Sequence, residues 1–207
     1  AEEYGCLSRA RLIREVKMRI VAISDTHGLH ENLIIPDGDV LIHAGDLTSQ
    51  GKLSQIKEFN SWFGSHPHRH KIAIAGNHDW ALQTVPEEAK KLLTSCIFLQ
   101  DSGVEINGLK IYGSPWQPLF FDWAFNLPRG KSLKKVWSKI PIDTDVLITH
   151  GPPFGILDLV PSGEHVGCED LKRRLCELNL RAHIFGHIHE GYGTKTINDC
   201  KFVNAST

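Results

Sequence analysis

The sequence has no long apolar run. No stretch approaches the roughly 20 apolar residues that a helix needs to cross a bilayer. The first 17 residues carry charged side chains, among them Glu2, Arg9 and Arg14, in place of the apolar core of a signal peptide. We therefore expect no membrane partner and interpret residues 1–17 as an N-terminal extension.

Paired cysteines and an excess of one charge are also missing. The five cysteines are scattered and form no C-x-x-C pair, which favours a reducing compartment and a cytoplasmic location. The 23 Lys and Arg residues nearly balance the 24 Asp and Glu residues, so the formal net charge is −1. Because this balance gives no overall field that attracts nucleic acid, we expect a small substrate and no nucleic-acid partner.

The 207 residues suffice for one well-buried domain, which we place at residues 18–207. Strand-like apolar runs alternate there with amphipathic patterns that predict helices over 53–63, 87–93 and 169–178, an arrangement typical of an α/β fold. Asn107-Gly108 lies between two short alternating runs and predicts a β-hairpin. An antiparallel pair is therefore expected to join a largely parallel sheet.

The segment from Ser114 to Ile140 has the least regular pattern and reads as a long, partly packed loop. Its first half holds a group of five aromatic residues, which either stack on a nucleobase or pack the loop against the sheet, and packing is the favoured reading. They are Trp116, Phe120, Phe121, Trp123 and Phe125.

Five apolar runs each end in a turn that carries Asp, Asn or His. Buried strands of an α/β sheet read as such runs, and ligands bind at their carboxyl ends, so we expect the five turns to meet at one rim. In chain order the turns are Asp25-Thr26-His27, Gly45-Asp46, Gly76-Asn77-His78-Asp79, His150 and Gly186-His187-Ile188-His189.

These residue types predict a metal cluster at the rim. Carboxylate, amide oxygen and imidazole together suit Mn, Fe, Zn or Co better than Ca or Mg. We expect two such ions, with Mn favoured. A pair of ions needs a bridging ligand, and a carboxylate such as Asp46 has the two oxygens and the negative charge for that role.

In this order the turns resemble the motifs D-x-H, G-D, G-N-H-D/E, H and G-H-x-H of the calcineurin-like metallophosphoesterases. The resemblance spans Met18 to about Asn204. Residues 113–118 and 121–126 look similar to the metallophosphoesterase-domain-containing subgroup, which resembles class III cyclic nucleotide phosphodiesterases. The implied fold is an αββα sandwich of two mixed sheets flanked by helices.

By position, the resemblance implies two metal sites that share Asp46. One site would consist of Asp25, His27, Asp46 and His189, and the other of Asp46, Asn77, His150 and His187. His78 would protonate the leaving group, and Asp79 would orient His78. Asn77, His78 and His189 would contact the substrate.

The implied function is hydrolysis of small or cyclic nucleotide phosphodiesters. Two metal ions would lower the pKa of a shared water, and the resulting hydroxide would attack phosphorus in line. One alternative is a phosphomonoesterase, although Gly45–Gly51 lacks the arginine of the protein Ser/Thr phosphatase motif G-D-x-V-D-R-G. Another is a metal- and nucleotide-binding scaffold with little turnover, which the intact ligand positions disfavour.

Other histidines are interpreted as structural. His43 and His183 lie within apolar runs and are expected to be packed and hydrogen-bonded. His66, His68 and His70 alternate before a predicted strand, away from the expected rim. They are not assigned to the metal cluster.

Overall fold

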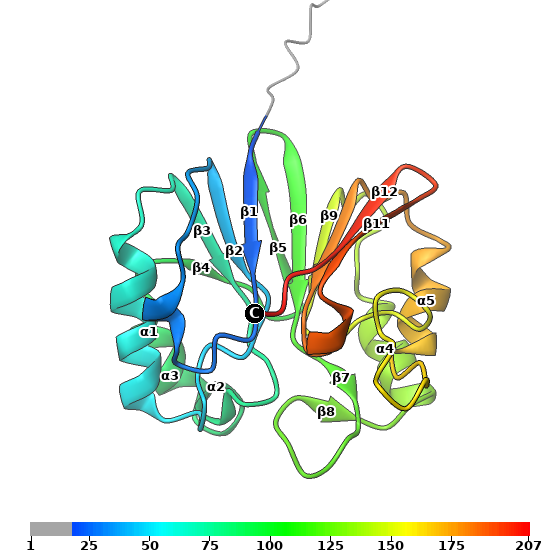
Figure 1. Ribbon diagram of the computed structural model, residues 1–207, viewed down its shortest axis with the longest axis horizontal. Coiled ribbons are helices and arrows are strands. Elements are labelled where there is room, and N and C mark those ends of the chain that lie inside the picture. The colour runs from blue at the N-terminus through cyan, green and yellow to red at the C-terminus, as the bar shows by residue number, and fades with distance from the viewer. Residues whose placement is uncertain (1–17) are drawn as a thin grey trace, which may run out of the picture.

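The computed structural model describes residues 18–207, in which two β-sheets pack face to face between helices (Figure 1). The predicted extension over residues 1–17, including Cys6, lies outside the described residues. The division into this extension and one domain therefore stays a prediction. Among residues 18–207, no helix is both long and apolar enough to cross a membrane.

Strands and helices alternate along the chain, as the sequence predicts. The elements are β1 (Ile20–Ile23), η1 (His30–Asn32), β2 (Val40–His43), α1 (Leu53–Ser65), β3 (His70–Ala73), α2 (Trp80–Thr84), α3 (Pro86–Leu92), β4 (Ile97–Phe98), β5 (Ser102–Ile106), β6 (Leu109–Ser114), β7 (Gln117–Pro118), β8 (Asn126–Leu127), α4 (Lys131–Trp137), β9 (Val146–Thr149), α5 (Glu169–Leu175), β10 (Ala182–Phe185), η2 (His189–Gly191), β11 (Gly193–Ile197) and β12 (Cys200–Asn204).

The α/β sandwich predicted from the resemblance is confirmed. One sheet has the order β1-β2-β3-β4, and the other has the order β11-β12-β10-β9-β6-β5. The six-stranded sheet is mixed, because β5 and β11 each pair antiparallel with their neighbour. The four-stranded sheet contains parallel pairs throughout, which refines the expectation that both sheets are mixed.

Three apolar layers hold the sandwich together. One lies between the four-stranded sheet and α1 and α3, one between the sheets, and one between the six-stranded sheet and α4 and α5 (Figure 1). Alternation along a strand serves two layers at once: Leu41 belongs to the first, whereas Val40 and Ile42 belong to the second. Strands covered on both faces therefore read as continuous apolar runs.

The predicted local elements form with small shifts at their ends. α1, α3 and α5 occupy the three predicted helical segments. Asn107 and Gly108 have φ values of 51° and 81°, the left-handed pair that a two-residue hairpin turn needs.

The segment from Ser114 to Ile140 corrects the sequence interpretation. It is not one long loop, because it contains the β7–β8 pair and helix α4. α4 buries Leu133, Val136 and Trp137 against the six-stranded sheet. Its seven residues are too few to show a clear helical period within a segment rich in proline.

Candidate metal centre

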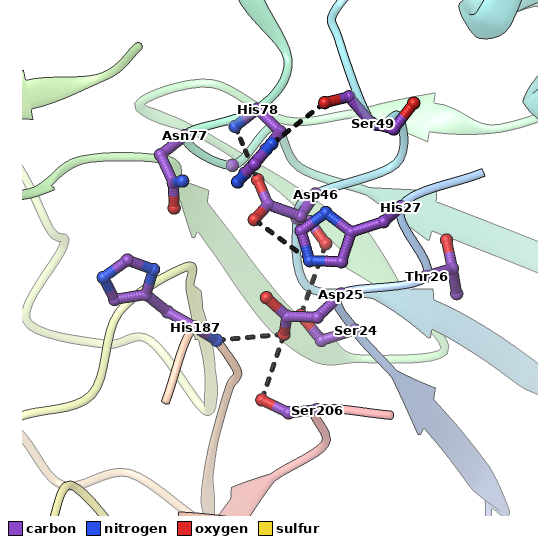
Figure 2. A network of polar contacts seen from close by, with 12 residues as sticks. Ser24, Asp25, Thr26, His27, Asp46, Ser49, Asn77, His78, His187 and Ser206 are labelled. Carbon is purple, nitrogen blue, oxygen red and sulfur yellow. Dashed lines mark hydrogen bonds and ion pairs between the residues drawn. The ribbon is translucent and has the colours of Figure 1, made fainter. Parts of the chain in front are cut away.

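The polar turns predicted to meet do lie together, at the carboxyl ends of the strands in both sheets. Figure 2 shows residues of four of these turns, and His150 of the fifth lies beside Asn77. Asp25, Asp46 and Asn77 follow β1, β2 and β3. His150 follows β9, and His187 and His189 follow β10. Parallel neighbours end at the same edge of each sheet, and the face-to-face packing brings the two edges together.

Asp25 is buried, and its two carboxylate oxygens have different surroundings. Its Oδ2 accepts hydrogen bonds from the backbone N–H of His187 at 2.9 Å and from the Ser206 hydroxyl at 3.0 Å. Its Oδ1 lies 3.6 Å from His189 Nε2 and has no hydrogen-bond partner within residues 18–207. A buried carboxylate oxygen without a donor is suited to a cation.

Asp46 lies between imidazoles that come from different sheets. Its Oδ1 accepts a hydrogen bond from the backbone N–H of His78 at 2.8 Å. Its Oδ2 lies 3.7 Å from His27 Nε2 and 3.5 Å from His150 Nε2. The carboxylate therefore faces both halves of the centre.

Asn77 and His150 form the buried side of the centre. The Nδ1 of His150 lies 3.0 Å from the carbonyl of Ala44, which can only accept, so Nδ1 carries a hydrogen. The other ring nitrogen, Nε2, lies 2.8 Å from the Asn77 amide oxygen, while the Asn77 Nδ2 has no partner within residues 18–207. His150 Nε2 and the Asn77 amide oxygen thus point to one place, which suits a cation.

The remaining predicted ligands complete the cluster. The ring of His187 lies 4.9 Å from the ring of His150, centroid to centroid, and the ring of His27 lies 5.7 Å from that of His189. Three sets with ligand atoms within 4.8 Å of one another overlap here: Asp25, His27 and His189; His27, Asp46 and His78; and Asp25, Asp46 and His150. All seven predicted metal ligands are therefore brought together.

The backbone at the centre adopts conformations that most residues avoid. Asp25, His27, Asp46 and His187 have φ values of 59°, 46°, 56° and 70°. Left-handed backbone at non-glycine residues costs about 1–3 kcal/mol and concentrates at functional sites. Two glycines allow close approach: a Cβ at Gly186 would overlap Asp25 Oδ2, and one at Gly76 would overlap Asp46 Oδ1.

His78 lies at the open side of the centre, but its expected partner differs. Its Nδ1 lies 3.0 Å from the backbone carbonyl of Ser49, so this nitrogen carries a hydrogen. Asp79 instead accepts hydrogen bonds from the backbone of Leu47, Thr48 and Gly76 and from the Thr48 hydroxyl. None of its hydrogen bonds within residues 18–207 reaches the His78 ring, and the prediction that Asp79 orients that ring is corrected.

The pKa values of the buried groups reflect their neighbours. Burial opposes the charged form of His150, but Asp46 outweighs it and raises the pKa of His150 to about 9. Burial lowers the pKa of His187 to about 4. Burial, reinforced by the charge of Asp46, raises the pKa of Asp79 to about 7. Although burial opposes it, the nearby ring of His189 and the charge of His150 hold the pKa of Asp25 well below its usual range.

A cavity of about 630 Å³ opens onto this cluster. Five residues of the cluster line its floor: His27, Asp46, His78, His187 and His189. Of the three residues expected to contact substrate, His78 and His189 line the cavity, whereas Asn77 is buried and faces His150. The cavity continues between residues 118–123 and residues 151–167.

The sequence analysis missed residues that support the centre from elsewhere in the chain. The Ser206 hydroxyl holds Asp25 across 181 positions of sequence, and the Asn204 amide oxygen accepts a hydrogen bond from the backbone N–H of Ser206 at 3.1 Å. Ser49 acts through its backbone carbonyl, which no residue type reveals. The one local pattern that could have pointed to Ser206 is the strand-like run just before it, because residues after a strand lie at the rim.

The histidines interpreted as structural lie where predicted. His43 and His183 are fully buried, and their Nε2 atoms lie 3.0 Å and 2.8 Å from the hydroxyls of Thr26 and Thr149. His66 follows α1 and His70 begins β3, at the opposite end of that strand from Asn77.

The carboxylates, amide oxygen and imidazoles of the cluster form a donor set that fits divalent metal ions.

Known proteins share this sequence over most of its length. The profile of the family described as calcineurin-like phosphoesterase matches residues 18–191. The human protein named Metallophosphoesterase domain-containing protein 1 is 46% identical over 213 residues, which cover 91% of this chain and 65% of that protein. A UPF0046 protein of Caenorhabditis elegans is 40% identical over 216 residues, which cover 94% of this chain and 76% of that protein.

The chain spans 65% of the human relative, slightly less than two thirds of its length. Its fold is also found in proteins of much lower sequence identity. The crystal structure of the protein TT1561 of Thermus thermophilus is 14% identical with a TM-score of 0.64, and the match covers 90% of this chain and 88% of that one. Because the family profile covers most of the chain and ends at the last histidines of the cluster, the chain belongs to the calcineurin-like phosphoesterase family.

Proposed function

We propose that the chain is a phosphodiesterase that uses two divalent transition-metal ions, with manganese favoured, to hydrolyse small or cyclic nucleotide phosphodiesters. The observation that supports this most directly is the position of Asp46, whose Oδ2 lies 3.7 Å from His27 and 3.5 Å from His150. A carboxylate placed between two sets of donors can serve both ions.

Each ion would have four donors. Asp25, His27, Asp46 and His189 would hold one, and Asp46, Asn77, His150 and His187 the other. When bound, such a pair supplies a water of lowered pKa and positive charge for the phosphoryl oxygens. The cavity of about 630 Å³ has room for organic groups on the phosphate.

His78 would handle the proton of the leaving group. Its Nδ1 donates to the Ser49 carbonyl, which leaves Nε2 as the nitrogen free to hold and release a proton. His78 lines the cavity, so a leaving oxygen can reach it. Asp79 would act indirectly. It would hold the backbone of Leu47 and Thr48, which follow Asp46, and of Gly76, which precedes Asn77 and His78.

The test is hydrolysis by metal-stripped protein reconstituted in turn with Mn, Zn, Fe and Mg. Bis-p-nitrophenyl phosphate, p-nitrophenyl phosphate and 2′,3′- and 3′,5′-cyclic nucleotides are the substrates. We expect metal-dependent turnover of diesters over monoesters. Preference for the monoester would replace the proposal with a phosphomonoesterase, and two bound ions without turnover would replace it with a binding scaffold.

We also propose a cytoplasmic location. Cys96, Cys168, Cys176 and Cys200 are all free thiols in the described residues, as in proteins of reducing compartments. Fractionation of cells that express the protein tests this, and recovery in a secreted or organellar fraction would contradict it.

A further inference from the structure

One wall of the cavity is aromatic and stands beside His78. Phe120 and Trp123, from the segment between β7 and β8, line it. The Trp123 ring lies 4.7 Å from the His78 ring and 6.1 Å from the Phe120 ring, centroid to centroid, in edge-to-face contacts. Phe125 of the same segment is fully buried in the core, and Phe120 is 57% exposed. The segment thus packs through some rings and leaves others open.

The opposite wall is a folded segment, residues 152–167, which presents Val160, Glu164 and Val166 to the cavity. The buried carboxylate of Asp158 holds this segment, because it accepts hydrogen bonds from the backbone N–H groups of Gly155 and Gly167, both at 2.9 Å. The cavity lining therefore combines the aromatic rings with a second segment that is held in place by hydrogen bonds.

The charge of the cavity beyond the metal centre is negative. Among the described residues that line it, Arg129 is the sole lysine or arginine. Its guanidinium donates to the carbonyls of Val166 and Gly167, each at 2.8 Å, and to the carboxylate of Glu169. Glu164 and Glu190 also line the cavity, and both are exposed. A second negative group on a substrate would meet these carboxylates without a free cation.

We propose that this cavity selects phosphodiesters that carry a flat ring and no negative charge beyond the phosphodiester itself. The ring lies against Phe120 and Trp123, and a neutral or positively charged substituent on it faces Glu164 and Glu190. This inference rests on the proposed function, because it takes the metal centre as the place where the phosphoryl group binds.

Uncleavable phosphonates separate binding from turnover. The measurement is the dissociation constant, by isothermal titration calorimetry on manganese-loaded protein, for methylphosphonate, phenylphosphonate, 4-carboxyphenylphosphonate and 4-(trimethylammonio)phenylphosphonate. We expect phenylphosphonate to bind about tenfold more tightly than methylphosphonate, from ring stacking. The carboxylated ring is expected to bind several-fold more weakly than phenyl, and the trimethylammonium ring more tightly.

Variants assign these preferences to residues. Trp123→Ala should reduce the preference for phenyl over methyl to less than about threefold, and Trp123→Phe should retain most of it. Glu164→Gln combined with Glu190→Gln should remove the discrimination against the carboxylated ring. Glu87→Gln changes an exposed carboxylate on α3, outside the cavity lining, and should not shift the constants.

An adenine-bearing phosphonate identifies the source of the ring. Tighter binding than phenylphosphonate would assign it to a nucleobase, and equal binding to aryl groups in general; both outcomes support the inference. Equal binding of methyl, phenyl and carboxyphenyl phosphonates would overturn it and leave the proposed function standing. Failure of all the phosphonates to bind, methylphosphonate included, would overturn both.

Discussion

The two sheets bring different atoms to the same centre. The turns after the four-stranded sheet supply all the oxygen donors of the proposed set, Asp25, Asp46 and Asn77, together with one imidazole. The turns after the six-stranded sheet supply imidazoles only, those of His150, His187 and His189. The carboxylates thus come from one half and most of the imidazole rings from the other, so a complete centre requires both sheets to be in place.

Although their ligands differ, the two halves share one kind of supporting contact. Each sheet buries a strand histidine whose Nε2 contacts a threonine hydroxyl beside a proposed ligand. His43 contacts Thr26, between Asp25 and His27, and His183 contacts Thr149, before His150. The scaffold is therefore similar on both sides, and side chains such as Asp46, Asn77 and Ser206 make contacts between the two halves.

Asp46→Asn should break the link between the halves and have the largest effect. A neutral amide bridges two cations poorly, so we expect metal loss together with a fall in diesterase activity of about a thousandfold or more. Metal content by mass spectrometry and kcat/KM are measured on the same preparation. Asp199→Asn, in the exposed turn between β11 and β12, is the control and should change neither. Full metal content with unchanged turnover would exclude the bridging role.

His78→Ala should remove rate without removing metal. Loss of a proton donor costs about a hundredfold or more, and the loss should be greatest for poor leaving groups. Rates for diesters whose leaving groups differ in pKa check this, alongside metal content. Because His78 shares a possible ligand set with His27 and Asp46, a drop in metal occupancy would instead make it a ligand of the first half.

Acid should weaken both halves through their buried histidines. Burial lowers the pKa of His43 and of His183 to about 3. In the unfolded chain these rings titrate near pH 6.5, so stability is full above that pH and falls as pH drops from 6.5 towards 3. The loss is about 2 kcal/mol per ring at pH 5, from the linkage relation.

Single variants show whether the two rings act alike. His43→Gln and His183→Gln should each remove about half of their joint dependence between pH 7 and pH 5. Urea unfolding of metal-free protein at a series of pH values is the measurement. A pH profile unchanged in both variants would show that these rings are not the acid-sensitive groups.

The sequence predicted the shared scaffold better than the links across it. Apolar runs that end in polar turns are local patterns, so β1, β2, β9 and β10 and the ligands after them were found. The contact between Ser206 and Asp25 joins residues 181 positions apart and leaves no local trace. Asp79 was misassigned because its neighbour in sequence, His78, is not its partner in space, where the Thr48 backbone is closer.

Ser206→Ala should have the smallest effect of these variants. It removes one hydroxyl of the six-stranded half, which holds Asp25, a proposed ligand from the four-stranded half. The hydroxyl donates to Asp25 Oδ2, which then keeps only the backbone N–H of His187 as a partner. Loss of such support costs about tenfold in metal affinity. Competition with a fluorescent chelator measures that affinity. Ser61→Ala removes an exposed helical hydroxyl and should leave it unchanged. If Ser206→Ala binds metal as tightly as the parent, the backbone N–H of His187 is sufficient to hold Asp25.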